Sequence, residues 1–226
     1  MTEELMVGTI GWNHDDWIGS FYPDDLPDDW RFAYYSNEYR AVLVTANQFQ
    51  SLDKMTIAEW AEDSDEAFRF VIGIPETLVS ETDTLPLKNF LAELAPLGSR
   101  VCGFLLLLDI IDEGATSALA RTADQLQQFG PVCLDLKIES EIPAALLTVI
   151  DELNIGICWR PDRDDAPRPG GALKLALSSE SDPKIQRHII ELLEGWMQES
   201  AGLAGLFLDS PDQASQARII AEMLGI

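Results

Sequence analysis

Short apolar runs recur along the chain at nearly even spacing. Most are unbroken stretches of Val, Ile, Leu and Phe, a pattern typical of strands that are covered on both faces in a parallel sheet. The sequence therefore predicts eight buried strands, at Leu5–Ile10, Ala41–Thr45, Phe68–Ile74, Val101–Leu108, Val132–Lys137, Ile155–Trp159, Leu173–Leu177 and Gly205–Asp209.

Apolar residues at helical spacing fill most of the intervals between these runs. Asp182 directly before Pro183 is typical of a helix start. The segment Pro161–Gly171 is instead rich in Pro, Asp, Arg and Gly, so we expect a loop in place of one helix there. The predicted helices are Leu85–Leu94, Ser117–Phe129, Ala144–Leu153, one that begins at Pro183, and Ala214–Leu224, with weaker ones around Trp30–Ser36 and Thr56–Ala61.

Strands that alternate with helices predict an α/β protein with parallel strands. The chain has 226 residues, a typical length for one closed barrel. We therefore predict a single (β/α)₈ TIM-like barrel domain over residues 1–226, with one outer helix replaced by the loop Pro161–Gly171. A doubly wound open sheet is the alternative, and it has less support because no G-x-G-x-x-G follows the first strand.

Acidic residues dominate the charge. Asp and Glu number 39 against 15 Lys and Arg, which gives a net charge of −24. Such a surface repels nucleic acid and anionic lipid headgroups, so we expect neither as a partner. The start of the chain is acidic and lacks the basic region of a secretory signal, and the longest apolar run, Val101–Leu108, is too short to span a bilayer. We expect a cytoplasmic protein, and nothing in the sequence specifies its oligomeric state.

The three cysteines, Cys102, Cys133 and Cys158, all lie in or at the end of predicted strands. No C-x-x-C pair is present, so neither a disulfide framework nor a zinc ribbon is expected. Free cysteines commonly pack as small core residues. A three-thiolate metal site on adjacent strands is the alternative, and we expect no metal and no cofactor.

One stretch near the start resembles a known family. Gly8–Pro23 reads G-T-I-G-W, then a tryptophan and a glycine, then F-Y-P. This pattern resembles the opening motif of the YecE-like family, domain of unknown function 72, and Leu26-Pro27, Tyr34-Tyr35 and Trp60-Ala61 continue the match. The resemblance implies a parallel barrel with a cleft at the carboxyl ends of the strands, and it implies no established reaction.

Several polar positions of the family pattern are changed in this chain. The second strand has Leu43 at the family's acid and Thr45 at its amide, and the fifth has Asp135-Leu136-Lys137 in place of E-F-R. These changes imply a weakened or retuned pocket. Further departures are Phe49 for tyrosine, Ile74-Pro75 for lysine-proline, Glu81 for histidine, no R-x-H-G near Leu173–Ser179, and Asp209-Ser210 for paired asparagines.

Functional side chains of such barrels lie at the carboxyl ends of the strands. The candidate catalytic residues are His14, Asp135 and Lys137, of which the last two share one face of a strand. His14 with Asp15 could be an acid/base pair, or part of a capped turn under packed tryptophans. With only two histidines in the chain, a metal-dependent barrel enzyme is not expected. The candidate ligand-binding residues are Trp12, Asn13, Trp17, Thr45, Asn47, Asp109, Trp159, Arg160 and Asp209.

Three functions are consistent with these residues. The leading hypothesis is a non-catalytic or weakly active barrel that binds a small molecule at a remodelled mouth. The second is a small-molecule hydrolase or lyase that uses Asp135, Lys137 and His14. The third is an interaction module that uses its acidic surface. A mouth lined by Trp12, His14 and Lys137 would favour binding or catalysis, whereas one filled by Leu43, Phe49 and Trp17 would favour an inert scaffold.

Overall fold

The computed structural model describes residues 5–51, 54–79, 83–108, 113–137 and 142–226. All its strands are parallel and belong to one eight-stranded sheet with the order β6-β5-β4-β3-β2-β1-β8-β7. Each predicted apolar run overlaps one of these strands. The strands are β1 (Met6–Ile10), β2 (Ala41–Val44), β3 (Arg69–Ile74), β4 (Val101–Leu108), β5 (Val132–Leu136), β6 (Gly156–Ile157), β7 (Leu173–Ser178) and β8 (Leu203–Leu208).

The sheet curls until its first and last strands meet. β1 pairs with β2 on one side and with β8 on the other, so the open-sheet alternative is wrong. The remaining seam lies between β6 and β7, where Trp159 forms an isolated bridge to Ala176. The Trp159 amide donates to the Leu175 carbonyl at 2.8 Å, and the Leu177 amide donates to the Trp159 carbonyl at 3.0 Å. The result is a nearly closed (β/α)₈-type barrel, as predicted.

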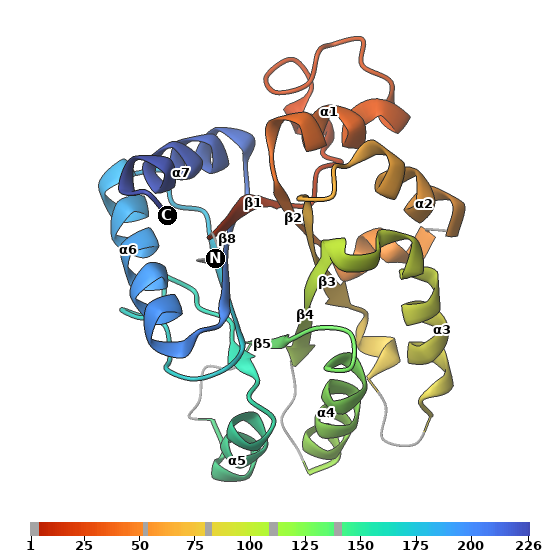
Figure 1. Cartoon of the computed structure of the whole chain (residues 1–226), viewed down its shortest axis with the longest axis vertical. Coiled ribbons are helices and arrows are strands. Elements are labelled where there is room, and N and C mark those ends of the chain that lie inside the picture. The colour runs from red at the N-terminus through yellow and green to blue at the C-terminus, as the bar shows by residue number, and fades with distance from the viewer. Residues whose placement is uncertain (1–4, 52–53, 80–82, 109–112, 138–141) are drawn as a thin grey trace.

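The helices surround this barrel on the outside (Figure 1). The Asp182 side chain accepts from the Lys184 amide at 2.8 Å and so caps the helix expected at Pro183. No helix lies between β6 and β7, a stretch that is described throughout, which confirms the predicted loop Pro161–Gly171. The α-helices are α1 (Arg31–Glu38), α2 (Lys54–Asp63), α3 (Leu85–Glu93), α4 (Glu113–Leu126), α5 (Ala144–Glu152), α6 (Pro183–Ser200) and α7 (Pro211–Leu224).

Two apolar clusters follow from the alternation of side chains along each strand. The larger one joins the outward-facing strand residues to the helices. The inner cluster fills the barrel itself, and nearly all of its members lie on strands. They are Met6, Ala41, Leu43, Val71, Cys133, Cys158, Leu173, Leu175, Leu177 and Phe207. The inside of the barrel is therefore a packed core rather than a pore.

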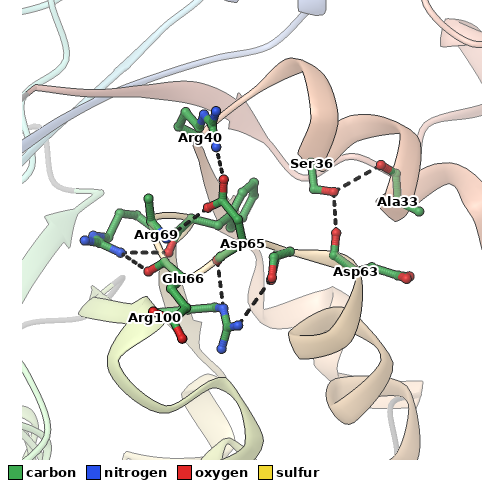
Figure 2. A network of polar contacts seen from close by, with 11 residues as sticks. Ala33, Ser36, Arg40, Asp63, Asp65, Glu66, Arg69 and Arg100 are labelled. Carbon is green, nitrogen blue, oxygen red and sulfur yellow. Dashed lines mark hydrogen bonds and ion pairs between the residues drawn. The ribbon is translucent and has the colours of Figure 1, made fainter.

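Three arginines stand where three neighbouring strands begin (Figure 2). Arg40 precedes β2 and forms an ion pair with Asp65, and Arg100 precedes β4 and donates from Nε to the Asp65 carbonyl at 2.9 Å. Arg69 opens β3 and donates to the Glu66 carbonyl at 3.0 Å. This network ties the loop between α2 and β3 to the amino-terminal face of the barrel, a face where side chains serve stability.

A side-chain hydrogen bond and a close backbone approach support the seam between β6 and β7. The buried Lys174 ammonium donates to the Ile157 carbonyl at 3.0 Å and lies 5.4 Å from the Trp196 ring. A side chain thus satisfies a carbonyl at the end of the two-residue strand β6. Gly156 approaches β7 so closely that a Cβ there would lie 1.7 Å from the Leu173 carbonyl oxygen. The backbones on the two sides of the seam are therefore in direct contact.

We predict that Gly156→Ala destabilises the protein by about 2–3 kcal/mol or more, because the added methyl group must push the two backbones apart. The matched control is Gly195→Ala in α6, where an added Cβ would meet no atom within 4 Å. That variant should gain about 0.5–1 kcal/mol. Urea unfolding of the three proteins measures both effects. Equal stability of Gly156→Ala and the wild type would show that the seam is not in contact.

Burial lowers the pKa of Lys174 below that of a free lysine. The unfolded chain therefore holds this proton to higher pH than the folded chain does. We predict that the wild type gains stability relative to Lys174→Met as the pH rises toward the ordinary lysine pKa of about 10.4. Unfolding curves of both proteins between neutral and alkaline pH measure the difference. A difference that stays constant or shrinks over this range would contradict a buried charged lysine.

Candidate functional site

The inward-facing rows of β5 and β6 continue from the barrel core into the mouth. Cys133 and Asp135 are two residues apart on β5, and Cys158 and Arg160 are two apart along the chain that leaves β6. Each pair therefore shares one face, with the thiols below and the charged groups above. Because β5 and β6 are neighbours, Arg160 can reach Asp135 across them.

Asp135 and Arg160 form a paired contact at this position. Arg160 Nη2 donates to Asp135 Oδ2 at 2.6 Å, and its Nε lies 3.4 Å from Oδ1. Asp135 is only 5% exposed, whereas the Arg160 side chain is 28% exposed. The fork geometry is the strong form of an arginine–carboxylate pair. One partner is thus buried in the barrel, and the other remains within reach of a molecule at the mouth.

Burial and the ion pair act on Arg160 in opposite directions. Burial disfavours its positive charge, but the hydrogen bond and the negative charge of Asp135 outweigh this effect and raise the pKa of Arg160. The guanidinium therefore stays charged at all accessible pH values. It supplies the mouth with a fixed cation beside a fixed acceptor.

Two of the three cysteine thiols have raised pKa values. A hydrogen bond to Cys133 and burial raise the pKa of Cys158 well above that of a free thiol. Burial raises the pKa of Cys102 to about 12. A thiol needs its thiolate form to act as a nucleophile or a metal ligand. All three cysteines are free, and the described residues contain no group of three metal-ligating side chains.

His14 lies at the mouth beside β1. Its Nε2 lies 2.9 Å from the Ile10 carbonyl oxygen, and its ring centroid lies 4.3 Å from that of Trp17. Since a carbonyl only accepts, Nε2 carries the proton, and Nδ1 is the acceptor of the neutral ring. Asp15, the expected partner of His14, pairs with Arg31 instead. The Asp15 carboxylate accepts from Arg31 at 2.9 Å, and Asn13 Oδ1 accepts from the same Arg31 nitrogen at 2.5 Å.

The end of β2 contributes a polar turn next to His14. Gln48 Oε1 accepts from the Thr45 amide at 2.9 Å, and the Thr45 hydroxyl lies 3.3 Å from the same oxygen. Gly11 has a φ of 73°, and a Cβ there would lie 3.1 Å from both the Gln48 amide nitrogen and His14 Nε2. Sequence reasoning missed Gln48. The sequence signal that could have identified Gln48 is its position three residues after Thr45, at the end of the second strand. Asn47 is exposed on the short turn η3 (Ala46–Ser51).

The tryptophans expected at the mouth are buried elsewhere. Trp12 packs edge-on against Trp60 at 4.6 Å and against Phe32 at 4.9 Å, in the layer between barrel and helices. Trp17 belongs to the same outer cluster. Trp159 closes the seam, and its indole nitrogen donates to the Asp164 carbonyl at 2.9 Å. Positive φ at Gly11 turns the chain outward after β1 and carries Trp12 into the shell. All three side chains are less than 6% exposed, which leaves them little surface for a ligand.

Two more candidates, Lys137 and Asp209, follow the ends of β5 and β8. Lys137 follows β5 and is exposed, so it is not the inward partner of Asp135. Asp209 is exposed after β8, and Ser210 rather than Asp209 caps α7, accepting from the Gln213 amide at 3.4 Å. Asp109 and Glu81 lie outside the described residues, as does the side chain of Phe49. Leu43 is 2% exposed and belongs to the inner cluster, as expected for a filled barrel.

Strand order decides which candidates can act together. In a ring of eight strands, β1 and β5 are four places apart in either direction. His14 and Asp135 therefore stand on opposite sides of the mouth. The structure brings together Asp135 with Arg160, and separately His14 with Gln48 and Thr45. It does not form a single cluster of His14, Asp135 and Lys137.

We predict that Arg160→Ala destabilises the protein by about 2–3 kcal/mol, because it leaves the buried Asp135 carboxylate without its cation. The control Arg163→Ala removes an exposed arginine of the same loop, 3.8 Å from Asp162, and should change stability by less than about 0.5 kcal/mol. Denaturant unfolding measures both. The double variant Asp135→Asn/Arg160→Ala should recover part of the loss. If Arg160→Ala and Arg163→Ala had the same stability, the pair would not be formed.

Comparisons with known proteins agree with this architecture. The family model described as "Protein of unknown function DUF72" matches residues 6–181, from β1 to the start of α6. None of the curated proteins matches the chain. No helix of the described residues is long and apolar enough to cross a membrane.

Solved structures show the same fold at low sequence identity. A DUF72 family protein from Enterococcus faecalis V583 superposes with a TM-score of 0.69 at 15% identity, over 99% of this chain and 98% of its own. One from Thermotoga maritima MSB8 gives 0.64 at 14% identity, over 99% and 100%. KGPDC from Streptococcus mutans gives 0.51 at 10% identity, over 97% and 99%. The matched motif region and the parallel barrel together show that this chain belongs to the DUF72 family of proteins of unknown function.

Proposed function

We propose that this barrel binds a small polar molecule at the carboxyl ends of its strands and transforms it weakly or not at all. The observation that carries this proposal is the Asp135–Arg160 pair, which stands above an apolar, filled barrel interior. A binding site of this kind needs a few fixed polar groups that orient the ligand. The pair supplies acceptors and donors in one rigid unit.

The charge distribution limits the class of ligand. The net charge of −24 repels polyanions, except over distances at which salt screens the charges. The local pair offers both signs of charge, and Thr45, Gln48 and His14 add uncharged polar groups on the other side of the mouth. We therefore favour a neutral or zwitterionic molecule, with its polar end at Arg160.

The geometry gives less support to a hydrolase or lyase that uses Asp135, Lys137 and His14. A general base must lie within hydrogen-bonding reach of the proton that it removes. Asp135 is already engaged by Arg160, and His14 stands across the mouth from it. We infer weak or absent turnover from this separation. The free cysteines fit a reducing compartment, and we propose the cytoplasm.

A thermal-shift screen of the wild type against polar metabolites tests the binding proposal. A ligand present at one hundred times its dissociation constant should add about 2.7 kcal/mol of stability. Arg160→Ala should weaken binding of the same ligand at least tenfold, whereas Arg163→Ala should bind like the wild type. Incubation of the ligand with the protein, followed by mass spectrometry, should show little or no product.

Two outcomes would contradict the proposal. The first is that no class of polar metabolite shifts the unfolding of the wild type. The second is a ligand that binds Arg160→Ala as well as it binds the wild type, which would place the site elsewhere. Rapid turnover that Asp135→Asn abolishes would favour the enzyme hypothesis instead.

A further inference from the structure

A cavity lies on the outside of the barrel, away from the mouth. It measures about 790 Å³ and is bordered by α3, by the beginning of β4 and by the end of α4. Figure 1 shows α3 and α4 as two separate helices outside β3 and β4. α3 has only nine residues and is followed by the turn η5 (Ala95–Arg100), in which Gly98 has a φ of 54°. The helical layer is therefore thin over the start of β4.

The walls of this cavity are mainly apolar. Leu91, Leu94, Val101, Phe104 and Phe129 all border it. Phe129 is 60% exposed and is one of the few large apolar residues at the surface. A cavity of a few hundred cubic ångströms with apolar walls and a few polar groups has the size and character of a small-molecule site. Such exposed apolar surface commonly marks a binding site.

One charged side chain borders the cavity. Among the described residues that line it, Lys88 on α3 is the only charged one. No carboxylate forms an ion pair with the Lys88 ammonium in the described part of the chain. The protein carries 39 acidic residues, so a wall whose described residues include one lysine and no acid differs from the rest of the sequence. Its local charge favours an anion.

An unsatisfied acceptor borders the same cavity. Gln125 Oε1, on α4, is buried and accepts no hydrogen bond from the described residues, while its amide nitrogen lies 3.5 Å from the Arg121 carbonyl oxygen. Buried polar atoms are normally hydrogen-bonded, and an unpaired one is costly. A ligand that carries a hydroxyl or an amide N–H would satisfy this oxygen.

We infer that this cavity binds a small amphipathic organic anion. The apolar body of the molecule lies between α3 and α4, its carboxylate pairs with Lys88, and a donor group reaches Gln125. The cavity has the volume of a small molecule. A second copy of this chain would bring two surfaces of charge −24 together, which their repulsion disfavours. The inference does not depend on the function proposed for the mouth.

Calorimetric titration with N-octanoylglycine tests the inference, because this probe combines an alkyl chain, an amide N–H and a carboxylate. We expect saturable binding at one site of the wild type. Lys88→Glu should weaken it at least tenfold, and Lys184→Glu, which makes the same charge change at an exposed site on α6, should leave it unchanged. Ala92→Trp places a large ring in the cavity from an exposed position of α3 and should abolish binding without unfolding the protein.

Decanoate, which lacks the amide, tests the role of Gln125. It should bind the wild type more weakly than N-octanoylglycine does, and Gln125→Leu should remove this difference. The inference is overturned if the wild type shows no saturable binding, if Lys184→Glu loses as much affinity as Lys88→Glu, or if Ala92→Trp still binds. A dimer that Ala92→Trp disrupts, seen by sedimentation without any probe binding, would assign the cavity to self-association and would also overturn it.

Discussion

Closure of the sheet is the constraint on which every other feature of this protein depends. Seven of the eight strand-to-strand contacts are ladders. The eighth is the seam between β6 and β7, which is joined by the two hydrogen bonds of Trp159 with β7 and by one from the Ala172 amide to the Asn154 carbonyl. Side chains that face inward converge only if the sheet is curled. The contact between Asp135 and Arg160 and the separation of His14 from both follow from that geometry. The hydrogen bond from Lys174 to the Ile157 carbonyl supports the weakest part of the ring.

The sequence predicted the architecture well because burial on two faces leaves a clear pattern. Unbroken apolar runs located all eight strands, and the composition of Pro161–Gly171 located the loop without a helix. The run at Ile155–Trp159 was predicted as a full strand, yet its ladder covers only Gly156–Ile157. Gly156 in this ladder also meets the Leu173 carbonyl across the seam. Such a contact between distant residues has no signature in a local pattern.

The candidate site was harder to predict, because it depends on side-chain reach between strands. Asp135 and Arg160 were each named from their positions at strand ends, but their pairing required the order of β5 and β6. Lys137, two residues after Asp135 on the same strand end, is exposed, and the guanidinium beside Asp135 comes from the chain that follows β6. Positive φ at Gly11 directs Trp12 into the layer of helices, and no local apolar pattern predicts such a turn.

The uneven distribution of backbone hydrogen bonds around the barrel also affects how the protein unfolds. Regions held by few backbone hydrogen bonds open with less free energy than those held by long ladders. The seam between β6 and β7 is joined by the isolated bridge at Trp159 and by a hydrogen bond from the Ala172 amide to the Asn154 carbonyl rather than by a ladder, so we expect the ring to part there first. Opening at the seam would move β7, β8 and β1 together away from β5 and β6 and leave the remaining ladders intact. Native-state hydrogen exchange would then begin at this line, well before the other strands lose protection.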